Sequence, residues 1–258
     1  MPHLRQQLTQ QIGLLRSLII YYRPWKNRQL ARFYSQFIRP GDLCFDVGAH
    51  VGNRLWAWTR LGACCVGVEP QPHLAAYLRR RYGHRPDIVL VEEAVGSAPG
   101  SATLHISRAN PTVTTLSQPW IDQVQRTDAF AQVVWDDAVT VPVTTLDALI
   151  AQHGLPAFCK IDVEGFELAV LKGLSQPIPA LSFEVVLAGG EEALADAVAC
   201  LERLCEIGGY RFNWSPGESH RLALADWIDG AALADYLGGL PPTANSGDVY
   251  AQIFEKAQ

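Results

Sequence analysis

The stretch FDVGAHVGN, residues 45–53, opens a repeating alternation of strand and helix patterns. An apolar run typical of a strand stops at Asp46, and Gly48 and Gly52 follow within six residues. Glycines at such a turn let the backbone approach a ligand closely, because no Cβ stands in the way. The spacing differs from the G-x-G-x-x-G turn of dinucleotide enzymes. The stretch therefore indicates a nucleotide-type loop whose ligand must be inferred from the rest of the chain.

Strand-like and helix-like segments alternate around this loop. This alternation is typical of a parallel sheet covered by helices. We predict an α/β fold: a doubly wound, Rossmann-like seven-stranded sheet, mostly parallel with an antiparallel last strand, and helices on both faces. The predicted strands are residues 43–49, 63–70, 87–95, 157–165, 180–187, 209–215 and 247–255. The predicted helices are residues 54–62, 72–83, 166–174 and 191–207, and residues 139–154 are predicted as a strand followed by a helix that Thr144 or Thr145 caps.

Two segments lie outside this alternation. Residues 1–40 are predicted as an N-terminal amphipathic helical segment, and residues 41–258 as one α/β domain. Within that domain, residues 108–138 are predicted as a loop or lid insertion with one helix. Loops of that length in a compact domain are often functional.

Composition and charge limit the classes of protein. The chain has 258 residues, 48% of them apolar, which is typical of a globular protein. Six cysteines without a C-x-x-C pair indicate neither disulfides nor a zinc site, so we predict a cytoplasmic location. Seven of the 21 basic residues precede Gly41, whereas all 26 acidic residues follow Pro40. The acidic body argues against a nucleic-acid partner, because phosphate binding needs a basic face.

The N-terminal segment has apolar residues at helical spacing: Leu4, Leu8, Ile12, Leu15, Ile19 and Tyr22. We interpret it as a surface helix that packs this apolar face on the body. The alternative is peripheral contact of residues 1–38 with an anionic membrane or a carrier protein. The sequence does not indicate the oligomeric state.

Three of the predicted strands end in acids, at Asp46, Glu69 and the pair Glu92–Glu93. Ligands of doubly wound sheets bind beyond the carboxyl ends of the strands, so these acids are expected at one site. Glu69 follows Asp46 by 23 residues and is placed to accept hydrogen bonds from two ribose hydroxyls. A carboxylate at Asp46 repels phosphate and suits a cationic ligand head. These features favour S-adenosylmethionine, a nucleoside with an amino-acid tail and a positive sulfur, over a dinucleotide.

Four stretches carry a family resemblance: FDVGAHVGN (45–53), VGVEPQP (66–72), EEAVGSAPGSATLHIS (92–107) and KIDVEGFELAVLKGL (160–174). In these stretches the chain resembles the FkbM family of methyltransferases, a branch of the class I S-adenosylmethionine-dependent fold. The resemblance covers residues 40–190 well and residues 190–258 loosely. It implies that residues 41–258 form an S-adenosylmethionine-dependent methyltransferase domain.

The resemblance also implies the cofactor contacts. The loop within FDVGAHVGN, called the first loop below, would line the methionine side of the cofactor. Glu69 would hold the ribose hydroxyls, and Glu93 and Ala94 would contact the adenine. The family commonly has Asn where this chain has His50. We interpret His50 as a plain replacement, and the alternative is a titratable group beside the reacting centre. The implied cofactor-binding residues are Asp46, Gly48, Ala49, His50, Gly52, Asn53, Glu69, Pro70, Glu93, Ala94 and Asp162.

The chemistry is expected on the strand 157–165. Lys160, Asp162 and Glu164 alternate there with apolar residues, so all three are predicted to share one face of the strand. We favour the hypothesis that Asp162 or Glu164 is the general base, or positions the acceptor hydroxyl.

Glu184, in the strand 180–187, is predicted to contact the acceptor from the same crevice. Together with Asp162 and Glu164 it completes the predicted catalytic set. A less favoured hypothesis is a divalent metal held by Asp162 and Glu164 with His50 or Glu184. We assign no metal ligands.

The predicted function is therefore S-adenosylmethionine-dependent methylation. The resemblance favours a hydroxyl on a small molecule, a sugar or glycan, or a polyketide-type acceptor, with a nitrogen acceptor as the variant. Two other classes are kept as alternatives: a nicotinamide-dependent oxidoreductase and a non-catalytic binding protein with a methyltransferase fold. The first would need a pyrophosphate turn that FDVGAHVGN does not supply.

Overall fold

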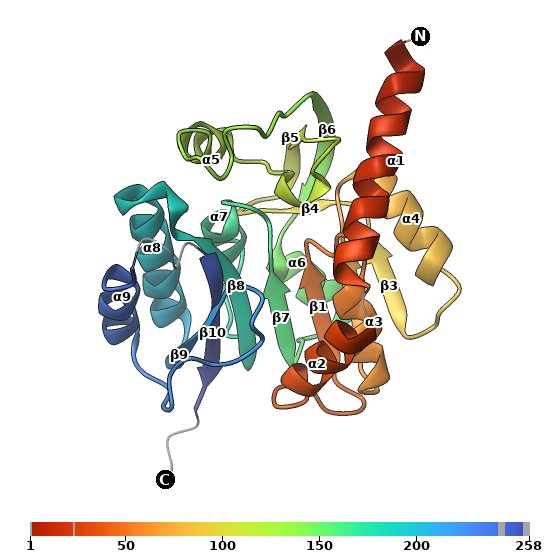
Figure 1. Cartoon of the computed structure of the whole chain (residues 1–258). Coiled ribbons are helices and arrows are strands. Elements are labelled where there is room, and N and C mark those ends of the chain that lie inside the picture. Colours follow the sequence, from red (N-terminus) through yellow and green to blue (C-terminus); the bar gives the residue numbers. More distant parts are fainter. Residues whose placement is uncertain (1, 23, 242–245, 255–258) are drawn as a thin grey trace.

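The computed structural model describes residues 2–22, 24–241 and 246–254, with the backbone alone for residues 2–7, 24–26 and 189. A seven-stranded sheet of order β3-β2-β1-β7-β8-β10-β9 runs through the molecule (Figure 1). All neighbouring strands from β3 to β8 pair in parallel, and β10 pairs antiparallel with both β8 and β9. This arrangement confirms the predicted fold, and it places the antiparallel last strand inside the sheet rather than at its edge. The strands are β1 (Leu43–Val47), β2 (Cys64–Val68), β3 (Ile88–Val91), β7 (Phe158–Ile161), β8 (Ala180–Val186), β9 (Tyr210–Pro216) and β10 (Ser246–Ile253).

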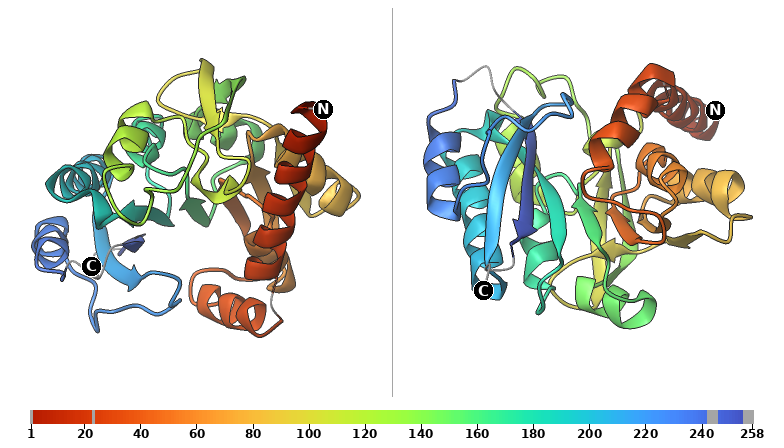
Figure 2. Two further views of the ribbon diagram at one scale, coloured as in Figure 1. Left: turned by 45° about the horizontal axis from the view of Figure 1, so that its top comes forward. Right: turned by 90° about the horizontal axis from the view of Figure 1, so that it is seen from below.

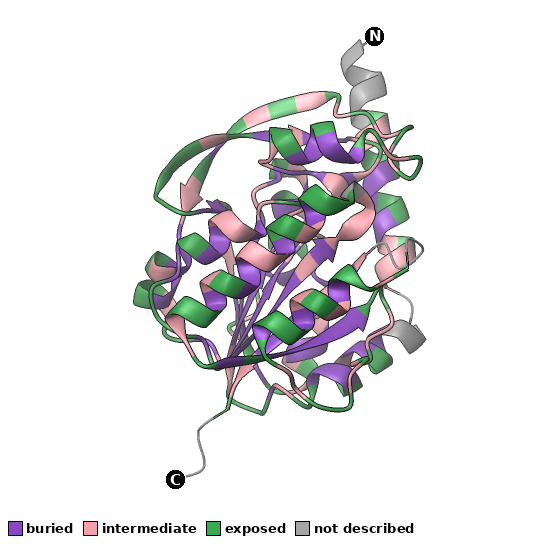
Figure 3. Cartoon of the chain, turned by 90° about the vertical axis from the view of Figure 1, so that its left-hand side faces the viewer, coloured by how far each residue is buried: buried purple, intermediate pink, exposed green. Residues whose placement is uncertain are grey.

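Helices cover both faces of this sheet, as the two further views in Figure 2 show. One core cluster joins the sheet to α6, α7, α8 and α9, and a second joins it to α2, α3 and α4. Most residues of the central strands β1, β2, β7 and β8 are buried, and the helices turn their exposed residues outward (Figure 3). The helices are α2 (Pro24–Tyr34), α3 (Asn53–Arg60), α4 (Pro72–Tyr82), α6 (Leu146–His153), α7 (Glu167–Lys172), α8 (Glu191–Ile207) and α9 (Gly230–Gly238).

Local sequence signals set several of these boundaries. Thr145 caps α6 by accepting a hydrogen bond from the Ala148 N–H, as one of the two predicted caps. Pro72 occupies the first turn of α4, where its missing N–H costs no helical hydrogen bond.

A second, three-stranded sheet of order β4-β6-β5 lies beside the first. The predicted strand 87–95 is wrong as one element, because the chain leaves the main sheet after Val91 and joins β6 at Ala94. Residues 101–107 lie within EEAVGSAPGSATLHIS, one of the stretches that carry the family resemblance. Most of them belong to a strand that pairs antiparallel with β6. The strands are β4 (Ala94–Val95), β5 (Gly100–Ile106) and β6 (Asp137–Thr144).

The predicted lid, residues 108–138, joins β5 to β6. It contains the short 3-10 helix η1 (Pro111–Val113) and the helix α5 (Gln118–Val124). Trp120 and Trp135 pack against each other in a small cluster of the lid. The lid therefore has its own apolar core.

The predicted strand 157–165 ends earlier than expected, at Ile161. Glu164 and Gly165 both adopt left-handed backbone conformations, with φ of 52° and 81°. A strand cannot contain such residues, so the expectation that Lys160, Asp162 and Glu164 share one strand face is wrong. Asp162 and Glu164 instead lie on the turn between β7 and α7.

The N-terminal segment forms α1 (Pro2–Tyr21) and α2. In α1, Leu14, Leu18 and Tyr21 pack against the body around Val51 and Leu74. The predicted packing face is wrong for Leu8, Ile12, Leu15 and Ile19, which are exposed, whereas Tyr22 of that face does pack against the body. The reason is that α1 has apolar residues on more than one side, so periodicity alone did not select the buried one. Leu4 of that face lies outside the residues whose side chains are described.

Among the residues described, no helix has the length and apolarity needed to cross a bilayer.

The stability of the central sheet should depend on Leu181 in β8. Leu181 is fully buried, whereas Leu155, in the connection between α6 and β7, is 47% exposed. We expect Leu181→Ala to lower the free energy of unfolding by about 2–5 kcal/mol. The matched change Leu155→Ala should cost less than about 0.5 kcal/mol, because it opens no cavity. Urea denaturation of both variants measures the difference, and equal costs would contradict this packing.

Candidate active site

A cavity opens where β1, β2 and β7 end, at the edge where doubly wound sheets bind ligands. Residues of the lid between Pro111 and Leu116 contribute to its lining. Of the predicted site residues, ten line it: Gly48, His50, Asn53, Glu69, Pro70, Glu93, Ala94, Asp162, Glu164 and Glu184. The cavity lining does not include the other three: Asp46, Ala49 and Gly52.

The first loop is folded tightly over the end of β7. Gly48 has a φ of 84°, and a Cβ at this position would overlap the carbonyl of Asp162. The N–H groups of Gly48 and Ala49 both donate to the carbonyl oxygen of Val68. A glycine is therefore required at position 48 both for the backbone conformation and for the close approach of β7.

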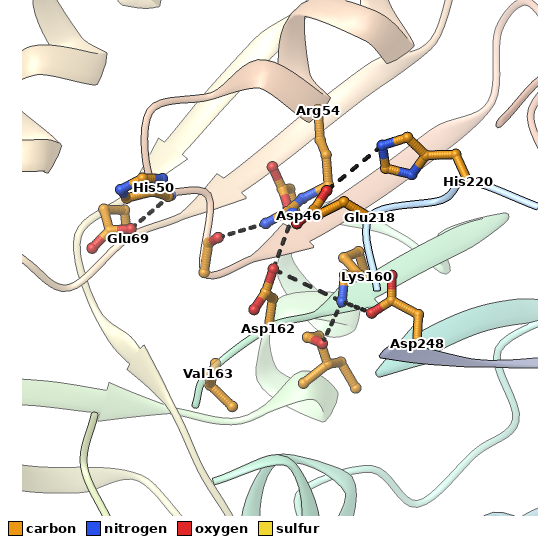
Figure 4. Close-up of polar contacts among 12 residues, drawn as sticks. Asp46, His50, Arg54, Glu69, Lys160, Asp162, Val163, Glu218, His220 and Asp248 are labelled. Atoms are coloured by element: carbon orange, nitrogen blue, oxygen red, sulfur yellow. Dashed lines mark hydrogen bonds and ion pairs between the residues drawn. The ribbon is translucent and has the colours of Figure 1, made fainter. Parts of the chain in front are cut away.

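Arg54, in the first turn of α3, joins the first loop to the β7–α7 turn (Figure 4). Its Nε lies 2.6 Å from Asp46 Oδ1, and its Nη1 lies 3.0 Å from Asp162 Oδ2. Its Nη2 donates to the Gly48 carbonyl oxygen at 2.9 Å. Arg54 is absent from the predicted site residues, and Asp46 is predicted to face the ligand. Asp46 is instead fully buried and paired with Arg54.

Lys160 provides a second buried cation beside this pair. Its Nζ lies 2.6 Å from Asp248 Oδ1 and 3.8 Å from Asp162 Oδ2. Burial alone would raise the pKa of Asp162, but the charges of Lys160 and Arg54 outweigh it and hold that pKa below its ordinary value. Asp162 is thus held as a charged carboxylate.

Glu69 follows the end of β2 and contacts the first loop through its carboxylate. Oε2 accepts a hydrogen bond from the His50 N–H at 2.7 Å, and Oε1 accepts one from the Gln71 N–H at 2.9 Å. Each oxygen retains capacity to accept a further hydrogen bond, for example from a ribose hydroxyl. Burial raises the pKa of Glu69 to about 8, although both N–H groups oppose the shift.

His50 is held between the first loop and α1. Its ring meets Tyr21 edge-on, with 5.3 Å between the ring centroids. Burial lowers the pKa of His50 to about 3, and the charge of Arg54 adds to the effect. The imidazole is therefore neutral at physiological pH, which supports its interpretation as a plain replacement.

Three carboxyl groups converge in the cavity. Asp162, Glu164 and Glu184 each offer an oxygen, and these oxygens lie within 4.8 Å of one another. Burial, followed by the charge of Asp162 and of Glu167, raises the pKa of Glu164. Burial and the charges of Glu164 and Asp162 raise that of Glu184.

The turn that carries Glu164 is fixed by the lid. The Thr115 hydroxyl donates to the Glu164 carbonyl oxygen at 2.6 Å. A Cβ at Gly165 would overlap the Trp120 ring, so the glycine lets the lid pack directly on this turn. Glu164 thus has a positive φ in a turn that the lid contacts, and such conformations cluster at active sites.

Two cavity residues come from segments with no motif. Tyr21 is the last residue of α1, and Glu218 lies in the connection after β9. The Glu218 carboxylate lies 3.6 Å from His220 Nε2 (Figure 4). The sequence held no signal for either residue, because each reaches the cavity only through chain segments that are distant in sequence.

The fold is a doubly wound α/β sheet with a cavity at the carboxyl ends of its strands, which is where such folds bind nucleotide-type ligands. The family model of the methyltransferase FkbM domain matches residues 46–208, more than half of the sequence. This chain therefore belongs to the FkbM methyltransferase family, as the resemblance implied. Membership excludes the nicotinamide-dependent oxidoreductase alternative.

The comparison with solved structures returned matches of low identity. A precorrin-6y C5,15-methyltransferase from Geobacter metallireducens GS-15 has 12% identity and a TM-score of 0.41, and the match covers 86% of this chain and 87% of that one. An SAM-dependent O-methyltransferase from Thermotoga maritima has 9% identity and a TM-score of 0.41, over 95% and 72% of the two chains. The cofactor-bound MTB protein Rv0187 has 13% identity and a TM-score of 0.42, over 96% and 90%. The comparison with curated proteins returned no match. None of these likenesses bears on the acceptor.

The cavity residues fit the S-adenosylmethionine that family membership implies. Within the described part of the chain, Gln71 Oε1, Thr114 Oγ1 and His50 Nε2 are buried without a hydrogen-bond partner, and all three residues line the cavity. A nucleoside with an amino-acid tail has amino and hydroxyl groups that could satisfy such atoms. The individual cofactor contacts stay predictions.

Glu69 should make cofactor affinity depend on pH. Ribose hydroxyls donate to the ionised carboxylate, so we expect the dissociation constant for S-adenosylmethionine to fall as the pH rises through about 8. Glu69→Gln should weaken binding about 10- to 100-fold above that pH, as expected for hydrogen bonds to a charged group, and should flatten the pH dependence. Calorimetric titration at several pH values measures both effects.

The matched control for this experiment is Glu92→Gln. Glu92 lies one strand away, pairs with Arg79 and does not line the cavity, so its loss should leave affinity and pH dependence unchanged. An unchanged pH profile in Glu69→Gln would contradict the role of Glu69.

His50 can be tested by restoring the residue that is common in the family. Because the imidazole is neutral and its Nε2 makes no bond in the described structure, His50→Asn should change cofactor affinity by less than about threefold. The pH profile of the rate should not shift. A shifted rate profile would show that the imidazole titrates during turnover.

Proposed function

We propose that this methyltransferase transfers the methyl group of S-adenosylmethionine to a hydroxyl of a small molecule, a sugar or glycan, or a polyketide-type acceptor. The observation that carries the proposal is the set of three carboxyl groups that line the cavity within 4.8 Å of one another. Methyl transfer to a hydroxyl needs a group that removes a proton, and a carboxylate in a partly dry pocket suits this role.

The three carboxyl groups have different environments and therefore different roles. Asp162 is charged and held by two cations, which makes it a poor proton acceptor and a good positioning group. Among the described residues, no ion pair joins Glu164 to a basic side chain. The raised pKa of Glu164 makes its carboxylate a stronger base. We therefore assign the general base to Glu164 and acceptor contact to Glu184.

Glu164 would act as the base of the reaction. Its carboxylate would accept the proton of the acceptor hydroxyl, so that the oxygen could receive the methyl group as the carbon–sulfur bond of the cofactor breaks. The sulfonium group supplies an activated methyl when the cofactor is bound. The turn between β7 and α7 holds Glu164 in one conformation, because Thr115 and Trp120 of the lid contact it.

A groove on the far side of Glu184 provides room for an extended acceptor. It lies between the lid, α7 and α8, and Glu184 lines both it and the first cavity. Trp120, Phe166 and Val186 give the groove an apolar wall beside polar groups such as Lys172. An acceptor with both apolar and hydroxylated parts, such as a polyketide or a glycoside, matches this lining.

A divalent metal is the less favoured alternative at the same carboxyl groups. Glu184 belongs to the three-residue group with metal-ligand spacing, whereas His50 does not. A chelator such as EDTA separates the two hypotheses: loss of activity that Mg²⁺ restores would favour the metal, and unchanged activity would favour the base.

The location and the partners are further parts of the proposal. All six cysteines are free, which agrees with a reducing, cytoplasmic location. The excess of acidic residues after Pro40 still argues against a nucleic-acid partner.

The base assignment predicts a selective defect. Glu164→Gln should lower kcat about 100-fold or more, because it removes proton abstraction. Cofactor affinity should change little, because Glu69 and the first loop are untouched. Glu202→Gln, an exposed change on α8, is the control and should have wild-type kinetics.

A screen of hydroxylated acceptors with radiolabelled S-adenosylmethionine supplies the assay. Full activity of Glu164→Gln on the best acceptor would contradict the assignment. Cofactor binding without transfer to any acceptor would favour the non-catalytic alternative.

A further inference from the structure

The outward side of α1 exposes a row of large aliphatic side chains. Leu8, Ile12, Leu15 and Ile19 have exposed fractions of 61%, 58%, 57% and 58%. Their spacing puts them on one face of the helix, here called the outer face of α1. They are four of the eight large apolar side chains that the described residues expose. Contiguous exposed apolar rows mark interaction surfaces, whereas single exposed residues do not.

The opposite side of α1 is fixed to the body, so the outer face cannot turn inward without breaking those contacts. The Tyr22 hydroxyl, just after the helix, donates to the Val51 carbonyl oxygen at 2.8 Å and contacts the Tyr82 hydroxyl. A Cβ at Gly13 would overlap the Arg108 carbonyl oxygen, which shows how closely α1 approaches the end of β5. In Figure 1 the helix stands along the edge of the molecule and extends beyond the body.

The sequence segment that carries this face has charges of one sign only. Residues 1–41 contain seven basic residues and no acid, although the whole chain has a net charge of −5. The helix α4, which packs beside α1, adds three consecutive exposed arginines, Arg79, Arg80 and Arg81, of which Arg79 pairs with Glu92. On α1 itself, Arg16 is exposed next to Leu15 and donates to the Asn110 side chain. Ten of the 21 basic residues of the sequence therefore belong to the N-terminal segment or to the last turn of α4.

We propose that the outer face of α1 docks this protein on an anionic phospholipid membrane. A row of aliphatic residues beside basic residues is the pattern of helices that lie in the lipid headgroup region. A protein partner is favoured less, because the row lacks the aromatic residues that dominate protein interfaces. The proposal goes beyond the proposed function and does not depend on it, since it concerns where the chain binds and not what it methylates.

Docking by α1 would also affect the cavity. Tyr21 ends the helix and lines the cavity, and its ring touches His50 of the first loop. The same helix thus carries the docking row on one side and part of the cavity wall on the other. An acceptor that partitions into a membrane would be delivered close to the carboxyl groups.

Vesicle flotation of the full chain tests the proposal. We expect binding to phosphatidylcholine vesicles that contain phosphatidylglycerol, and about tenfold weaker binding to vesicles of phosphatidylcholine alone. High salt should weaken the binding to anionic vesicles. The double variant Ile12→Glu and Leu15→Glu should lose about tenfold or more in vesicle affinity.

A matched control separates the apolar contribution from the added charge. Val134→Glu with Leu155→Glu also replaces two exposed aliphatic residues and adds the same charge, far from α1 in sequence. This control should bind anionic vesicles within about threefold of the wild type. Calorimetric S-adenosylmethionine affinity and circular dichroism should be unchanged in both double variants, which shows that they fold.

Three results would overturn the proposal. The first is a wild-type chain that does not float with anionic vesicles. The second is equal vesicle affinity for the two double variants. The third is a wild-type dimer in analytical ultracentrifugation that Ile12→Glu with Leu15→Glu converts to a monomer, because a second copy would then cover the face. A wild-type chain that binds an acidic carrier protein but does not float with anionic vesicles gives the first result.

Discussion

The geometry of the site depends on the contacts that the Arg54 guanidinium makes. It bonds the carboxylate of Asp46, the carbonyl oxygen of Gly48 and the carboxylate of Asp162 at once. These three groups belong to β1, the first loop and the β7–α7 turn, so one side chain fixes the relative position of the three elements. Buried ion pairs of this kind contribute little net stability, but removing one partner is costly because a charge is left uncompensated. Arg54 thus specifies geometry more than it stabilises the fold.

The carboxyl groups of the site differ in how strongly their charged forms are favoured, and this difference follows from the arrangement of the cations. Arg54 and Lys160 form ion pairs with Asp46, Asp162 and Asp248. Glu164, on the β7–α7 turn, and Glu184, in β8, have no such partner among the described residues, and burial and repulsion from neighbouring carboxylates disfavour their charged forms. Two kinds of carboxyl group therefore coexist within one cavity, and the difference arises from which cations each can reach.

The lid and α1 complete a cavity that the sheet alone leaves open. The lid holds the turn of Glu164 through Thr115 and Trp120, and α1 contributes Tyr21 beside His50. Neither segment belongs to the repeating α/β pattern. Variation in these segments could change the acceptor while the sheet and the first loop are kept, because loops on a rigid scaffold commonly carry specificity.

The sequence by itself determined the fold class and ten of the residues that line the cavity. The alternation of strands and helices, the glycines of FDVGAHVGN and the acid at position 69 act through local backbone geometry and strand order, which periodicity reports directly. Only the tertiary structure decided that Arg54 neutralises Asp46, that Glu164 lies on a left-handed turn, and which side of α1 is buried. Each of these depends on contacts between segments far apart in the chain. Local propensity cannot encode such contacts, because the partner that selects the rotamer, the turn or the buried face is present only once the chain has folded.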